Sequence, residues 1–116
     1  MKIPLKQFQK KGVRRVLKAL DDAYRTWDED QDRSAVMLVA PTGSGKTVMA
    51  TEIIEGLLDG SIEAPERPAL RVLWLTDSPS LNRQSADKMD RYGDQLSYGK
   101  NLVVVDETYD LSLIHI

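Results

Sequence analysis

The sequence contains no cysteine and a single histidine among its 116 residues. The missing thiols exclude a disulfide-stabilised scaffold and every metal site that depends on thiolate ligands. No apolar run approaches the roughly 20 residues that a membrane-spanning helix needs. The first six residues, which read MKIPLK, lack the apolar segment of a secretory leader. We therefore expect a soluble, cytoplasmic protein.

A strong excess of charge of either sign is also missing. The chain has 16 Lys and Arg residues against 18 Asp and Glu residues, for a net charge of −2 and a pI of about 5.4. The overall basic character that usually marks a nucleic-acid-binding domain is therefore absent. Hydrophobic residues make up 41% and charged residues 29%, which is typical of a globular protein. The length suits one domain.

A glycine-rich segment at residues 40–47 reads APTGSGKT, follows the apolar run 35–39 and precedes a stretch with helical periodicity. This order is the context of a phosphate-binding P-loop. The glycines lack a Cβ, so successive N–H groups can converge on one anion at the positive end of the next helix. Lys46 can place its cation on the outer phosphates, and the Thr47 hydroxyl can bind Mg²⁺. The predicted nucleotide-binding residues here are Pro41, Thr42, Gly43, Ser44, Gly45, Lys46 and Thr47, with Lys46 also catalytic.

The periodicity of the remaining chain predicts alternating helices and strands. Helices are expected over residues 6–25 and 46–58, where Gly60 is the expected stop, and in a third segment that ends near Tyr92 and is capped by Ser78 or Ser80. Strands are expected over residues 35–39, 70–76 and 102–105. This alternation predicts an α/β fold with a parallel sheet flanked by helices.

The first predicted helix has an apolar face and a basic face. The apolar residues at helical spacing are Phe8, Val13, Val16, Leu17, Leu20 and Tyr24, and the basic ones are Lys10, Lys11, Arg14, Arg15 and Lys18. The basic face is either a solvated surface or a phosphate-contacting patch, and both interpretations stay open. Residues 26–34 are predicted to form a loop, from which Trp27 folds back on the first helix as part of the core. The alternative for Trp27 is an exposed platform on which a base stacks.

Three segments together resemble superfamily 2 helicases and translocases. The glycine-rich loop, with Ala40 in place of the first glycine, resembles motif I of that family. Residues 5–9, LKQFQ, resemble the segment before motif I, often LRxYQ. Residues 73–84, LWLTDSPSLNRQ, resemble motif Ia of the type III restriction enzyme branch. The resemblance implies a P-loop NTPase (RecA-like) fold, of which residues 1–110 would form the N-terminal part of the ATP-binding domain.

The resemblance also implies roles for individual residues. It assigns Gln9 to the adenine edge, which suits a carboxamide because that group has both a donor and an acceptor. It assigns the turn after the second strand to the nucleic-acid backbone, with the hydroxyls of Thr76, Ser78 and Ser80 as contacts. Asp77 stands where many members have proline, and an acid beside a phosphate is unfavourable. Lys6 replaces a common arginine and loses bidentate bonding, so we assign it no specific role.

Two interpretations are open for Asp106 and Glu107, which directly follow the third predicted strand. They are either the Mg²⁺-binding motif II of the family or a strand end with a polar turn. Asp106 follows Lys46 by 60 residues (106 − 46), fewer than the family usually places between the two motifs.

The last six residues, 111–116, read LSLIHI and can be encoded by CTG TCT CTT ATA CAC ATC. That string resembles a transposon mosaic-end adapter used in sequencing libraries. We interpret these residues as translated adapter, so His115 is excluded as a ligand or base. On this hypothesis the natural sequence is interrupted near Asp110. We then expect an unpaired strand edge, uncovered apolar surface and poor solubility.

These features predict the ATP-binding portion of an ATP-dependent nucleic-acid helicase or translocase of the type III restriction kind. The implied cofactors are ATP and Mg²⁺. The implied partners are DNA or RNA and a modification or specificity subunit of a restriction complex. The parent protein is expected to hydrolyse ATP. The chain alone is not, because it contains no secure general base or arginine finger. Two alternatives are a P-loop phosphotransferase acting on a small substrate and a non-enzymatic nucleic-acid-binding module.

Overall fold

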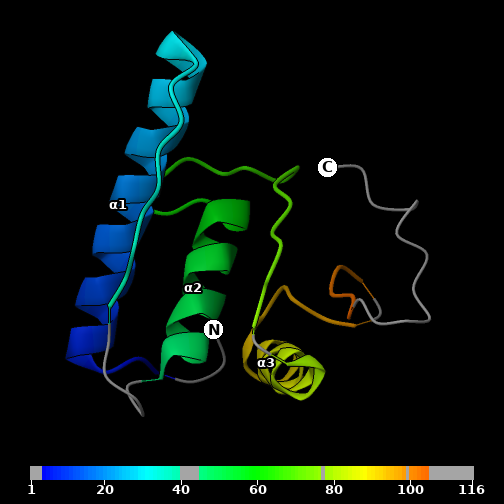
Figure 1. Cartoon of the computed structure of the whole chain (residues 1–116). Helices are drawn as coiled ribbons and strands as arrows, with labels where there is room; N and C mark the ends of the chain where they lie inside the picture. The colour runs from blue at the N-terminus through cyan, green and yellow to red at the C-terminus, as the bar shows by residue number, and fades with distance from the viewer. Residues whose placement is uncertain (1–3, 40–44, 77, 99, 105–116) are drawn as a thin grey trace, which may run out of the picture.

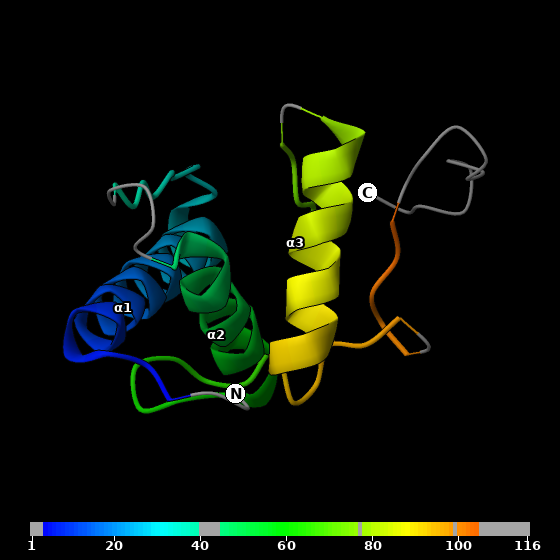
Figure 2. The same cartoon turned by 90° about the horizontal axis from the view of Figure 1, so that it is seen from below.

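The structure is a computed structural model that describes residues 4–39, 45–76, 78–98 and 100–104. Its helices are α1 (Gln7–Asp30), α2 (Lys46–Asp59) and α3 (Pro79–Tyr92). α2 packs against α1 on one side and α3 on the other (Figure 1). α1 and α2 run side by side in the same direction, whereas α3 crosses them steeply and is seen lengthwise in Figure 2. No helix within the described ranges is both long and apolar enough to cross a membrane.

The predicted α/β fold with a RecA-like parallel sheet is wrong for the part of the chain that the structure describes, which contains no β-strand. Residues 35–39 run along α1, and residues 70–76 run near α3, well apart from the first segment (Figure 1). Strands must lie about 4.8 Å apart to form a ladder. Apolar side chains of both segments face solvent, since Met37 is 85% exposed and Leu75 is 77% exposed. Apolarity reports a preference for burial, and it does not supply the neighbour that a strand needs.

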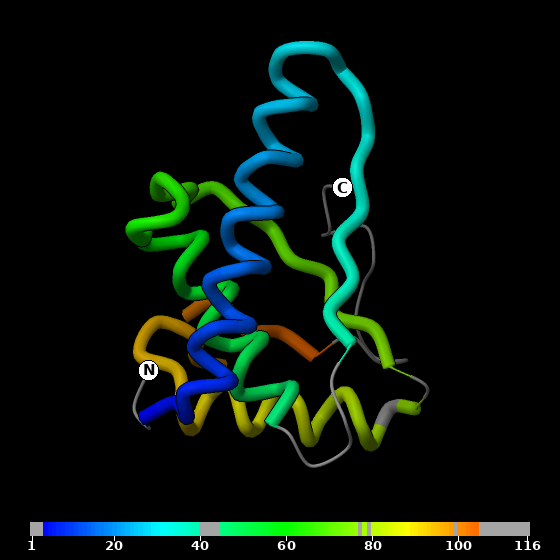
Figure 3. The backbone as a smooth tube through the Cα atoms, turned by 90° about the vertical axis from the view of Figure 1, so that its left-hand side faces the viewer, coloured from blue at the N-terminus to red at the C-terminus, as the bar shows by residue number. Residues whose placement is uncertain are grey.

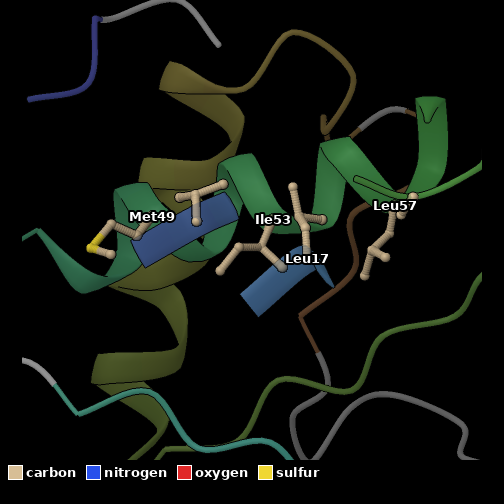
Figure 4. Close-up of a cluster of buried hydrophobic side chains, with 6 residues drawn as sticks. Leu17, Met49, Ile53 and Leu57 are labelled. Carbon is tan, nitrogen blue, oxygen red and sulfur yellow. The ribbon is translucent and has the colours of Figure 1, made fainter. Parts of the chain in front are cut away.

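The main core lies between α1 and α2. α1 contributes Val13 and Leu17, and α2 contributes Met49, Ile53 and Leu57, which lie four residues apart on one face (Figure 4). Side chains at this spacing stack along one side of a helix, so both helices present a continuous apolar stripe. A second, smaller cluster joins α2 to α3 through Ile54, Met89 and Leu96.

The bounds of α2 and α3 confirm the sequence predictions. α2 ends at Asp59 and Gly60 follows with a φ of 88°. A Cβ at Gly60 would meet the backbone nitrogen of Glu66 at 3.0 Å, so both the dihedral angle and the space favour glycine. The Ser78 side chain caps α3 by accepting a hydrogen bond from the Leu81 N–H at 3.3 Å.

The prediction for the end of α1 is wrong, because the helix continues to Asp30 through the segment expected to be a loop. The helix ends at Gln31, which has a φ of 60°. The backbone N–H and the Nε2 of Gln31 both donate to Trp27 O, at 2.9 and 2.7 Å. Trp27 was expected in the core and is instead 43% exposed. The predicted motif II pair, Asp106 and Glu107, and the predicted adapter segment 111–116 lie outside the described residues.

Candidate nucleotide-binding site at the start of α2

Gly45 precedes α2 in a left-handed conformation, with φ 81° and ψ 41°. Residues with a Cβ are strained there, which explains glycine at this position. Gly45 O accepts the Met49 N–H at 3.0 Å and so begins the helical hydrogen-bond pattern. Gly45 has no side chain to cap α2, and no side chain among the described residues caps it. The positive end of α2 is therefore suited to an anion.

Lys46 and Thr47 are the first residues of α2. Lys46 is exposed, which allows its cation to reach a ligand at the helix end. Thr47 is half-buried, and its carbonyl accepts a hydrogen bond from Thr51 Oγ1 at 2.7 Å. Thr51 is only 1% exposed, so this bond ties the first turn of α2 to the interior. Within the described ranges no hydrogen bond engages the Thr47 hydroxyl.

Gln9 comes from the first turn of α1 and lies against this helix end. A Cβ at Gly45 would stand 2.4 Å from Gln9 Nε2, so the carboxamide occupies the space that glycine leaves open. Gln9 is 8% exposed, and its Oε1 accepts the Lys6 N–H at 2.9 Å. This bond orients the carboxamide by satisfying one N–H at the start of α1. The structure thus brings together Gln9 and Gly45, two predicted site residues far apart in the sequence.

The other predicted loop residues, Pro41, Thr42, Gly43 and Ser44, lie outside the described residues. The described part of the predicted site therefore consists of Gly45 directly before α2, Lys46 and Thr47 at the start of α2, and Gln9 on α1.

The three hydroxyls predicted to contact nucleic acid gather at the start of α3. Thr76 Oγ1 lies 3.0 Å from Ser78 O and 2.7 Å from Asn82 Oδ1. Because a hydroxyl has one proton, Thr76 donates to one of these acceptors at a time. Ser78 Oγ and Ser80 Oγ are 3.1 Å apart, and Ser80 is exposed. The hydroxyls therefore organise this turn among themselves, with Ser80 the most accessible.

An acidic hollow of about 510 Å³ lies between α1, the second half of α2 and the loop after α3. It does not reach Lys46. The acidic residues along it are Glu52, Glu55, Asp59, Glu63 and Asp94. Carboxylates would repel a triphosphate, so this hollow is not the predicted nucleotide site.

Glu55 is a structurally important residue that the sequence prediction missed. It is 5% exposed, and its Oε2 accepts the N–H groups of Asp94 and Gln95, each at 2.8 Å. Glu55 therefore holds the loop after α3 against α2 with charge-assisted bonds. The signal in the sequence is an acid within the apolar segment IIEGLL at residues 53–58.

Tyr98, which lies outside the predicted site, has a strongly raised pKa. Partial burial, the hydrogen bond of its hydroxyl to Asp87 at 2.5 Å and the negative charge of Asp87 raise the pKa of Tyr98 to about 12. Within the described ranges no group of three or more acidic or histidine side chains is placed to hold a metal ion. Thr47 is the metal ligand predicted from the sequence.

The sequence was compared with protein families, curated proteins and solved structures. A family described as "Type III restriction enzyme, res subunit" matches residues 2–112. The matched range includes α1, α2, α3 and the predicted site residues. No curated protein and no solved structure matches the chain significantly.

Proposed function

The chain belongs to the family of type III restriction enzyme res subunits, which have a helicase-type domain, and on that premise we propose that it is the ATP-binding portion of an ATP-dependent DNA or RNA translocase. The family match confirms the resemblance found in the sequence. The observation that carries the proposal is the left-handed Gly45 at the start of α2, followed by Lys46 and Thr47, with Gln9 packed against it.

In this proposal, the start of α2 binds the phosphates of ATP. The first N–H groups of α2 and the positive end of its dipole attract the anion, and the exposed Lys46 adds a full charge beside them. The Thr47 hydroxyl would serve as a ligand of Mg²⁺. Held there, the ion would supply positive charge that offsets the negative charge on the phosphates during transfer of the terminal phosphate to water. The Lys46 ammonium group stabilises the same negative charge electrostatically, because it is held beside the phosphates.

Gln9 is proposed to select adenine. Its Oε1 already accepts the Lys6 N–H, but a carbonyl oxygen has two lone pairs and can also accept the amino group of adenine. Nε2 supplies the donor for adenine N7. Guanine offers an acceptor where adenine offers the amino donor, so the same carboxamide discriminates against GTP.

The remaining parts of the proposal concern partners and turnover. The hydroxyls of Thr76, Ser78 and Ser80 contact the nucleic-acid backbone, which suits short polar side chains at a helix N-terminus. A modification or specificity subunit of a restriction complex is the proposed protein partner, and the cytoplasm is the proposed location. ATP hydrolysis is proposed for the parent protein. The chain alone is expected to bind ATP weakly without useful turnover.

Binding of a fluorescent ATP analogue, followed by anisotropy, tests the site. Lys46→Ala should weaken binding at least tenfold, because it removes the only side-chain cation at the start of α2 among the described residues. Lys88→Ala, which removes an exposed cation from α3, is the matched control and should change binding little. Equal binding by the Lys46 and Lys88 variants would contradict the site.

Competition by unlabelled ATP and GTP tests the role of Gln9. The wild-type chain should prefer ATP, and Gln9→Glu should lose the preference. A glutamate keeps an oxygen for the Lys6 N–H and removes the donor for adenine N7. If ATP and GTP compete equally well in the wild-type chain, the assignment of Gln9 is wrong.

A further inference from the structure

The N-terminal half of α1 carries positive charge only. Seven basic residues precede the first acid of the chain, Asp21: Lys2, Lys6, Lys10, Lys11, Arg14, Arg15 and Lys18. The five between residues 10 and 18 are all exposed. At about 100° per residue, Lys11, Arg15 and Lys18 fall on one face together with Gln7 and Phe8, away from the buried Val13 and Leu17. The whole chain has a net charge of −2, but positive charge is concentrated on this part of α1.

Neighbouring acids do not neutralise this surface. The first acids along α1, Asp21 and Asp22, both pair with Arg25, the former at 3.2 Å. Within the described ranges, no ion pair engages any of the five exposed cations between residues 10 and 18. Lys10 and Arg14 line the acidic hollow of about 510 Å³, whereas Lys11, Arg15 and Lys18 do not. These last three are the centre of the surface.

The stability of α1 does not account for this arrangement. A helix favours acids in its first turn and bases in its last turn, because these charges complement its dipole. α1 has no acid in its first turn and no base in its last turn, where Asp28, Glu29 and Asp30 gather instead. The order of charges is thus the reverse of the one that stabilises the helix. Helix stability therefore does not explain why the N-terminal half of α1 is basic, whereas binding of a negatively charged ligand does.

An exposed aromatic ring lies among these cations. Phe8 is 53% exposed, and it lines a hollow of about 420 Å³ together with Gln7, Lys11, Arg14 and Arg15. An aromatic ring beside a row of cations is the combination that binds single-stranded nucleic acid, because bases stack on the ring while phosphates meet the charges. An acidic peptide would use the cations and leave the ring in water. The ring therefore favours a polynucleotide.

We propose that Phe8, Lys11, Arg15 and Lys18 form a contact surface for single-stranded nucleic acid on α1, separate from the turn at the start of α3. Ten residues separate Phe8 from Lys18, which is about 15 Å along a helix, so the surface is long enough to contact more than one phosphate of a single strand. Figure 3 shows the N-terminal half of α1 in front of the rest of the chain, with no described segment lying over it. The surface deepens the function proposed above, since it adds a second contact for the same nucleic acid.

The test is anisotropy of a short fluorescent single-stranded DNA, titrated with the chain over a series of salt concentrations. The variant replaces three cations: Lys11→Gln, Arg15→Gln and Lys18→Gln. Glutamine has a helix propensity close to that of lysine and arginine, and the three side chains are exposed, so the fold should survive. The affinity should fall at least tenfold at low salt. The salt slope should fall by about two, because each lost phosphate contact removes about 0.7 on single strands.

A second triple variant has the same change of net charge and serves as the control. It carries Lys88→Gln, Arg91→Gln and Lys100→Gln, all at exposed positions away from α1. Its affinity should stay within about threefold of the wild type, because these cations are not part of the surface. If both triple variants weaken binding equally, only net charge matters and the proposed surface is wrong. Far-ultraviolet circular dichroism verifies that each variant keeps its helices.

Phe8→Leu tests the ring separately from the charges. Stacking is worth about 1–3 kcal/mol per base, so the loss of the ring should weaken single-stranded binding about fivefold or more. Binding to a duplex, whose bases are not available, should change little. Unchanged single-stranded binding would contradict a stacking role for Phe8. Poly-glutamate that competes as well as DNA of equal charge would identify an acidic protein segment as the ligand and overturn the proposal.

Measuring both ATP-analogue binding and DNA binding for the Lys46→Ala variant and the triple α1 variant separates this proposal from the proposed function. Loss of ATP binding on Lys46→Ala, together with DNA binding that ignores the α1 cations, would contradict the surface and leave the proposed function intact. DNA binding that depends on the α1 cations, together with ATP binding that ignores Lys46, would retain the surface and contradict the nucleotide site.

Discussion

The contact between Gln9 and Gly45 can be tested by a double-mutant cycle that needs no nucleotide. The perturbations are Gly45→Ala, Gln9→Ala and the two combined. Gly45→Ala acts through two separable effects, the left-handed backbone at φ 81° and the collision of the new Cβ with Gln9 Nε2 at 2.4 Å. Only the second effect depends on the side chain of Gln9.

The two effects have different magnitudes in the two backgrounds. A Cβ in the left-handed region costs about 1–2 kcal/mol, whatever surrounds it. The new Cβ also meets Gln9 Nε2, the far end of a flexible side chain, so the carboxamide moves and its bond to the Lys6 N–H is lost at a further cost of about 1 kcal/mol. Gly45→Ala should therefore lower the free energy of unfolding by about 2–3 kcal/mol in the wild-type chain. In the Gln9→Ala background it should cost only about 1–2 kcal/mol. Gln9→Ala by itself should cost about 1 kcal/mol, since it removes the bond to the Lys6 N–H.

The assay is urea unfolding followed by far-ultraviolet circular dichroism on the four proteins of the cycle. We expect a coupling free energy of about 1 kcal/mol or more between the two positions. Gln7→Ala, at an exposed position on the same turn of α1, provides a control cycle that should show no coupling to Gly45→Ala. An equal cost of Gly45→Ala with and without the Gln9 side chain would refute the contact and the proposed joint site.

Four further predictions follow from burial, backbone and charge. Leu17→Ala, at a position 3% exposed in the main core, should lower the free energy of unfolding by about 2–5 kcal/mol in the same urea assay. Gln31→Gly should raise the free energy of unfolding by about 0.5 kcal/mol, because relief of the left-handed φ of 60° exceeds the loss of one side-chain hydrogen bond. A lower free energy of unfolding would contradict this prediction. The Tyr98 pKa is raised from 10.0 to about 12, so the contribution of Tyr98 to stability should be complete below pH 10 and be lost as the pH rises to 12. Asp87→Asn should lower the Tyr98 pKa, as measured by spectroscopic titration of the ring. Leu75→Lys, at a position 77% exposed, should reduce light scattering of concentrated solutions without lowering the melting temperature, and a lower melting temperature would show that Leu75 is buried.

The helices could be predicted because their signals are local. The stripe of Met49, Ile53 and Leu57 shows the buried face of α2, and Gly60 shows its end. The continuation of α1 to Asp30 was missed because polar and acidic residues at 26–30 are as compatible with a loop as with an exposed helical turn. Trp27 was assigned to the core as the apolar exception in a polar and acidic segment, whereas its exposure depends on which neighbours the fold brings to it.

The predicted sheet was wrong because an apolar run does not show whether a strand will find a partner. Residues 35–39 and 70–76 have the composition of buried strands, and in the described structure they run without a pairing partner. Composition gives the preference of a segment, while pairing requires a second segment at the right distance and register. The same gap explains why Met37 and Leu75 are exposed despite their apolar character.

The sequence by itself determined the positions of α2 and α3, the order Gly45, Lys46, Thr47 at a helix start, and the family to which the chain belongs. These features depend on residues that are close in the chain, so spacing and residue type suffice to specify them. Only the tertiary structure decided that Gln9 lies against Gly45 and that Glu55 holds the loop after α3. It also decided that the two apolar runs stay apart, because contacts between distant residues depend on how the helices pack, which local preferences do not encode.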